Sequence, residues 1–124
     1  MKKVLFYSPD FNFCYSLLMY LQDKYNVTSS TDLSVLESLS ENSDFDLLII
    51  DAEPDLKIEQ LCSDIKNSHS DLKIILTYVY DEKMNSVENR VKKYISGVLY
   101  KPFNLTEFSK FLPGIVSDTN TQTV

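Results

Sequence analysis

The chain has 124 residues, of which 44% are hydrophobic and 24% are charged, as expected of one globular domain. Its 18 acidic and 12 basic side chains give a net charge of −6, which argues against binding to the phosphate backbone of nucleic acid. No apolar run approaches the roughly 18 residues that a membrane-spanning helix needs, and residues 1–3 lead into a short apolar run without a secretion signal. These features predict a cytoplasmic protein with neither nucleic acid nor membrane as a partner.

Five short segments are predicted to form strands, four of them apolar runs and one, residues 26–29, mostly polar. They cover, in order, residues 4–7, 26–29, 46–50, 72–77 and 97–100. The third segment contains four consecutive large apolar residues, which is typical of a strand buried on both faces inside a parallel sheet. Asp51 follows this segment directly. It is therefore expected at the carboxyl end of the strand, where open α/β sheets bind their ligands.

Each predicted strand is followed by a segment whose apolar residues recur every three or four positions, as in amphipathic helices. These helices are predicted to start near residues 12, 33, 55, 81 and 104, and the first covers 12–24. Asn12 and Asp55 are expected as N-caps, and Asn104 with Glu107 has the spacing of a capping box. The Pro113-Gly114 pair is expected to break or end the last helix.

The alternation of strands and helices predicts an α/β fold of the flavodoxin-like type. Right-handed crossovers between parallel strands give a doubly wound (βα)₅ domain, with a five-stranded parallel sheet and helices on both faces. The predicted domain covers residues 1–116. The polar residues 117–124 are expected to be a mobile tail or the cut end of a linker.

The sequence holds two cysteines and one histidine. Cys14 and Cys62 fall on the apolar faces of predicted helices, so we expect buried thiols in a reducing compartment, and neither a disulfide nor a metal pair. His69 lies in a polar connection with no second ligand type nearby, so no zinc site is expected there.

Four polar side chains follow predicted strands and are expected to meet at one edge of the sheet. They are Asp10, Asp51, Thr77 and Lys101. Two carboxylates suit a hard cation such as Mg²⁺. The cation, the lysine and the hydroxyl can together surround the oxygens of a phosphoryl group while a carboxylate attacks phosphorus. Asp51 is the candidate nucleophile, and its product would be an acyl phosphate.

This set, with the sequence Lys-Pro-Phe at 101–103 and the (βα)₅ pattern over residues 3–112, resembles the receiver domain of bacterial two-component response regulators. The resemblance implies a signalling domain and not an enzyme, with Asp51 as the phosphoacceptor. It implies that Thr77 bonds a phosphoryl oxygen and that Lys101 forms a salt bridge with the phosphate. The bond between Lys101 and Pro102 is usually cis in relatives.

The resemblance also implies the cofactor and the partners. Mg²⁺ would assist the transfer, and a histidine kinase or a phosphotransfer protein would donate to Asp51. A downstream protein or effector domain would read a surface built from the fourth helix, the fifth strand and the fifth helix, which is also where a homodimer would form. Glu88, Arg90 and Lys92 are predicted on the outer face of that fourth helix.

The predicted Mg²⁺ site departs from the receiver pattern, because receivers usually end the first strand in two consecutive acids. Counting from Asp10, apolar residues fall at +4, +7, +8 and +11, the phase that receivers show from their second acid. Pro9 therefore stands where the first acid would be, which weakens the site. Its remaining candidate ligands are Asp10, Asp51 and Glu53. Pro54 comes one residue earlier than in relatives and shortens the loop after Asp51.

Two further departures from the receiver pattern concern access to Asp51 and the aromatic residue of the conformational switch. Tyr78 follows Thr77 where relatives usually carry a small side chain, and its ring is expected to narrow access to Asp51. Val98 replaces the switch aromatic, with Tyr100 directly before the lysine. These departures favour an alternative function, a pseudo-receiver that binds partners without phosphorylation. A flavodoxin-like mononucleotide binder is disfavoured, because loop 8–12 has no glycine and places an acid where phosphate would lie.

Overall fold

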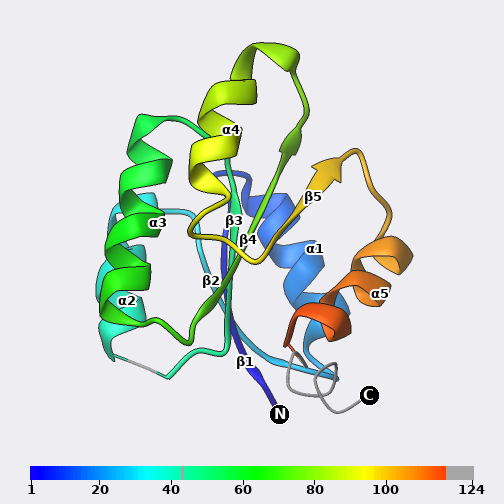
Figure 1. The fold of residues 1–124 in the computed structure, drawn as a ribbon. Coiled ribbons are helices and arrows are strands. Elements are labelled where there is room, and N and C mark those ends of the chain that lie inside the picture. The colour runs from blue at the N-terminus through cyan, green and yellow to red at the C-terminus, as the bar shows by residue number, and fades with distance from the viewer. Residues whose placement is uncertain (43, 117–124) are drawn as a thin grey trace, which may run out of the picture.

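The computed structural model describes residues 1–42 and 44–116 and shows a parallel sheet with helices on both faces (Figure 1). The strands are β1 (Lys3–Tyr7), β2 (Asn26–Ser30), β3 (Leu47–Asp51), β4 (Lys73–Val79) and β5 (Gly97–Lys101). Their order is β2-β1-β3-β4-β5, and every neighbouring pair is parallel. The predicted doubly wound sheet is therefore confirmed. The predicted tail, residues 117–124, lies outside the described residues.

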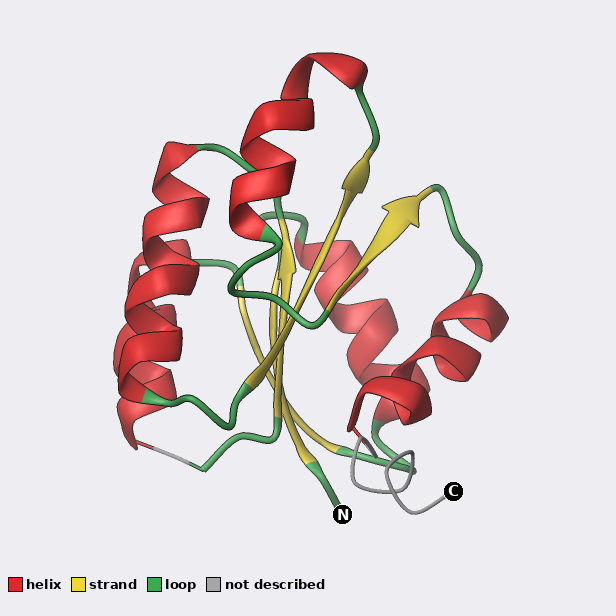
Figure 2. Cartoon of the chain, in the orientation of Figure 1, coloured by secondary structure: helices red, strands yellow, loops and turns green. Residues whose placement is uncertain are grey.

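The helices form one layer on each side of the sheet. They are α1 (Phe11–Leu21), α2 (Leu36–Asn42), α3 (Leu56–Ser68), α4 (Asn85–Val91) and α5 (Leu105–Val116), with 3₁₀ turns η1 (Leu33–Val35) and η2 (Glu82–Met84) before α2 and α4. Helices α1 and α5 cover one face, and α2, α3 and α4 cover the other (Figure 2). Within the described ranges, no helix is both long enough and apolar enough to cross a membrane.

Strand β3 lies at the centre of the sheet and supplies both cores. Its residues Leu47 to Ile50 are fully buried. Leu47 and Ile49 face the core under α1 and α5, whereas Leu48 and Ile50 face the core under α2, α3 and α4. Asp51 continues this alternation, so its side chain belongs to the α1/α5 face of the sheet.

The first turns of α3 and α5 have the predicted capping residues, whereas the capping residue of α1 differs from the prediction. Asp55 caps α3 by accepting the N–H of Ile58 at 2.8 Å, and Asn104 accepts the N–H of Glu107 at 2.8 Å. In α1, however, the cap is Asp10 and not Asn12. The helix begins at Phe11, so the Asp10 carboxylate is the one positioned to accept the first free N–H groups.

Helix α5 continues through the pair of residues that was predicted to stop it. It runs to Val116 with Pro113 inside it. The helix persists because Phe108, Leu112 and Val116 form a buried stripe, while Pro113 and Gly114 lie on the exposed side. Burial of the apolar stripe outweighs the loss of one backbone hydrogen bond at the proline.

Candidate functional site

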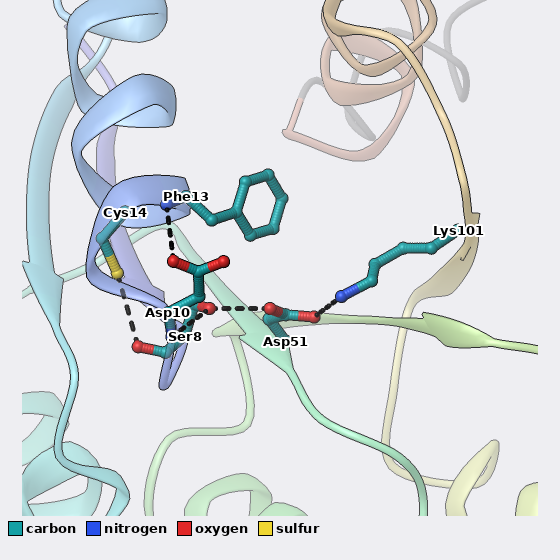
Figure 3. Close-up of polar contacts among 6 residues, drawn as sticks. All are labelled: Ser8, Asp10, Phe13, Cys14, Asp51 and Lys101. Carbon is teal, nitrogen blue, oxygen red and sulfur yellow. Dashed lines mark hydrogen bonds and ion pairs between the residues drawn. The ribbon is translucent and has the colours of Figure 1, made fainter.

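The carboxyl edge of the sheet holds an ion pair between two residues that lie 50 positions apart. Asp51 is the last residue of β3 and is 7% exposed, and Lys101 is the last residue of β5. Lys101 Nζ lies 2.8 Å from Asp51 Oδ1 (Figure 3). The Lys101 side chain is 35% exposed, so the pair is reached from solvent on the lysine side. The bond between Lys101 and Pro102 is cis, as the resemblance implied.

Ser8 provides the second contact of Asp51. Its hydroxyl donates to Asp51 Oδ2 at 2.7 Å and accepts the N–H of Asp10 at 3.0 Å (Figure 3). Tyr7 is the last residue of β1 and is in register with Ile50, so the residue after it, Ser8, comes opposite Asp51. Sequence reasoning missed Ser8 because it looked for an acid. The available signal was position, since Ser8 directly follows the first predicted strand as Asp51 follows the third.

Thr77 lies beside Asp51 on the neighbouring strand. The two residues are in register between β3 and β4, which places their side chains on the same face of the sheet. Thr77 is 1% exposed, and its hydroxyl has no hydrogen-bond partner among the described residues. A buried hydroxyl without a partner is unfavourable by about 1–3 kcal/mol. A ligand oxygen placed at this edge would satisfy it.

Tyr78 does not narrow access to Asp51, and that prediction is wrong. Successive side chains of a strand point to opposite faces, so the ring of Tyr78 lies in the core under α4 while Thr77 faces the Asp51 side. The Tyr78 hydroxyl donates a hydrogen bond to Glu88 of α4.

The predicted magnesium ligands do not form a metal site. Asp10 is exposed, and its Oδ1 accepts the N–H of Asn12 at 2.9 Å. It also accepts the N–H of Phe13 at 3.3 Å (Figure 3). Glu53 is exposed in the loop after β3. Over 1–42 and 44–116, no group of three or more histidine, cysteine, aspartate or glutamate side chains is placed to hold a metal ion. The set Asp10, Asp51 and Glu53 therefore does not fit Mg²⁺.

A cavity of about 500 Å³ opens next to Lys101. Its walls are largely apolar and include Phe13, Val79, Pro102 and Phe103, with Asp10 and Lys101 as its charged groups. Lys101 Nζ lies 5.6 Å from the centre of the Phe13 ring. The cavity is thus an open approach to the Asp51–Lys101 pair between α1 and the start of α5.

A buried carboxylate on α4 binds two tyrosines at the same end of the sheet. Glu88, predicted on the outer face, is 3% exposed, because Tyr78 and Tyr100 both reach it with their hydroxyl groups. The Tyr100 bond is 2.8 Å long, and Lys92 Nζ lies 3.5 Å from the other carboxylate oxygen. Burial by itself raises the pKa of Glu88, but the two hydroxyl groups and the Lys92 ammonium outweigh it and lower that pKa.

No family model and no curated protein matches the sequence. Solved structures do match. A two-component response regulator from Clostridium difficile has a TM-score of 0.80 and 20% identity over 97% of this chain and 99% of its own. Chemotaxis protein CheY4 of Vibrio cholerae has a TM-score of 0.78 and 20% identity over 93% and 98%.

A third match is a redox sensor of the streptococci, from a family described as evolved from two-component response regulators. Its TM-score is 0.85 at 16% identity, over 99% of this chain and 54% of that chain. At such identities the similarity establishes the fold. The chain has the fold of response regulator receiver domains, and it carries an aspartate–lysine pair at the carboxyl edge of the sheet.

Proposed function

We propose that this chain is a receiver domain of two-component signal transduction, in which Asp51 accepts a phosphoryl group from a histidine kinase or a phosphotransfer protein. The observation that carries the proposal is the Asp51–Lys101 ion pair at 2.8 Å, next to the unpartnered hydroxyl of Thr77. A nucleophile, a fixed positive charge and a free donor are the parts that phosphoryl transfer needs at such an edge.

The transfer follows from these three side chains. A carboxylate oxygen of Asp51 forms a bond to phosphorus, and the bond between phosphorus and the donor's imidazole nitrogen breaks. The electron pair leaves with the imidazole, which takes up a proton. The Lys101 ammonium offsets the charge on the phosphoryl oxygens, and the Thr77 hydroxyl donates to one of them.

The change at Asp51 would reach the surface of α4 through the two tyrosines. Tyr78 follows Thr77 and Tyr100 precedes Lys101, and both tyrosines hydrogen-bond to Glu88. A shift of the threonine or the lysine toward a phosphoryl group would therefore pull on α4. The downstream protein or effector domain, or a second copy of the chain, would respond at the surface formed by α4, β5 and α5.

The direct test is incubation with acetyl phosphate and Mg²⁺, followed by intact-mass analysis. The expected result is one acid-stable, base-labile phosphoryl adduct in wild type and none in Asp51→Asn. Absence of the adduct at saturating donor, with folded protein, would contradict the proposal.

A second candidate function is a pseudo-receiver that binds its partner without phosphorylation. It is favoured by the two protein contacts that already satisfy both oxygens of Asp51. In that case Asp51→Asn would bind the downstream partner with unchanged affinity, and wild type would take up no phosphoryl group.

A further inference from the structure

The contacts of Asp51 leave no oxygen without a donor from the protein. Lys101 binds Oδ1 at 2.8 Å and Ser8 binds Oδ2 at 2.7 Å. Asp51 is 7% exposed, so its charge needs compensation. The Lys101 ammonium supplies that positive charge. A divalent cation beside Asp51 would have to share an oxygen with one of these donors and would meet the lysine's charge at close range.

Two hydrogen bonds hold the Ser8 hydroxyl so that its proton is directed at Asp51. A serine hydroxyl has one proton and two lone pairs. The proton goes to Asp51, and one lone pair accepts the Asp10 N–H. Ser8 is fully buried, so solvent does not compete for either bond. A neutral donor thus occupies the end of β1 opposite Asp51, where a metal site would need an anionic acceptor.

The neighbouring acids do not replace the missing ligand. Asp10 is exposed and accepts two N–H groups of α1 through its Oδ1, and Glu53 is exposed in the loop after β3. Asp51 therefore stands as a single carboxylate, already paired with an ammonium group. A Mg²⁺ ion holds its water ligands strongly. Binding to one carboxylate that is already paired would offset little of the free energy lost when those waters leave.

We infer that the Asp51 pocket functions without a divalent cation and that Ser8 is a positioning residue, which holds Asp51 in place of the metal. The inference about metal binding rests on the contacts of Ser8, Asp51 and Lys101. Its consequence for catalysis rests on the proposed function: phosphoryl transfer to Asp51 is then as fast in EDTA as in Mg²⁺.

The test is a titration of the whole chain with Mn²⁺, followed by electron paramagnetic resonance, without any phosphoryl donor. Wild type is expected to show no saturable site that Asp51→Asn removes. Ser8→Asp places a second carboxylate next to Asp51, and carboxylate oxygens are the ligands that hard divalent cations prefer. We expect Ser8→Asp to bind Mn²⁺ at a saturable site that wild type lacks. Ser86→Asp, on the exposed side of α4, adds the same charge elsewhere and is the control.

Two results would overturn the inference. One is a saturable Mn²⁺ site in wild type that disappears in Asp51→Asn. The other is a folded Ser8→Asp protein, checked by circular dichroism, that binds Mn²⁺ no better than Ser86→Asp. If Ser8→Asp does not fold, the comparison of wild type with Asp51→Asn decides. Because the titration contains no donor, it can fail while the phosphoryl adduct still forms, and the reverse also holds.

Discussion

At the scale of single residues, the Asp51 carboxylate depends on Lys101 for its counter-charge. Lys101→Met keeps the length of the side chain but leaves a largely buried carboxylate with the Ser8 hydroxyl as its remaining donor. We expect a loss of about 1–3 kcal/mol in the free energy of unfolding, measured by urea denaturation. Lys93→Met, on an exposed lysine, is the control and should change stability by less than about 0.5 kcal/mol. An equal effect of both substitutions would show that the ion pair contributes nothing.

The Glu88 carboxylate is a second residue whose charged form the fold requires. Both tyrosine hydroxyls donate to the same oxygen, Oε2, so Glu88→Gln keeps an acceptor for them, but it loses the negative charge and places an amide donor next to the Lys92 ammonium. We expect a loss of about 1–3 kcal/mol at neutral pH. Glu82→Gln, at an exposed position in η2, is the matched control.

The stabilisation by Glu88 should depend on pH. The fold lowers the pKa of Glu88 below its ordinary 4.5, so its contribution is complete above that value. The contribution is lost as the pH falls through the lower pKa of the folded state, because the unfolded chain then takes up the proton more readily. Urea denaturation at pH 7 and well below pH 4.5 should show a smaller acid-induced loss for Glu88→Gln than for wild type. Equal losses would contradict the assignment.

At the scale of elements, two residues on the exposed side of helix α5 lower the stability of that helix. Pro113 removes a backbone donor there, and Gly114 has no methyl group although an added Cβ would meet nothing within 4 Å. Pro113→Ala should stabilise the protein by up to about 3 kcal/mol and Gly114→Ala by up to about 1 kcal/mol. The same measurement on Gly97→Ala should show destabilisation, since its Cβ would lie 3.1 Å from the Phe111 ring. Destabilisation by Gly114→Ala would mean that the helix does not extend past Pro113.

At the scale of the whole molecule, one sheet separates two cores, and each core holds one free thiol. Cys14 is on the buried face of α1, and Cys62 is on the buried face of α3. Burial raises the pKa of Cys14 and raises that of Cys62 to about 12. Because both cores share all of β3, they should unfold together.

This cooperativity can be followed with a thiol reagent in increasing urea. Neither thiol should react in the native protein, and both should become reactive over the same urea range. The variants Cys14→Ala and Cys62→Ala assign the signal to each core. Reaction of one thiol at clearly lower urea would show that its core opens independently.

The sequence by itself determined the element types, the buried central strand and the meeting of Asp51 with Lys101. These follow from short-range patterns: apolar runs of strand length, helical spacing, and the rule that carboxyl ends of parallel strands share an edge. Caps at Asp55 and Asn104 were predictable for the same reason, since each depends on a few consecutive residues.

Only the tertiary structure decided which partner each of these polar side chains binds. From the sequence, the Asp10 carboxylate suited either a helix cap or a metal ligand. Because α1 starts at Phe11, Asp10 caps that helix. Glu88 turned inward because two tyrosines from different strands reach it, a contact that no local pattern indicates. Ser8 became the partner of Asp51 through the register of β1 against β3. Such choices depend on distances between segments far apart in the chain, which residue spacing alone does not specify.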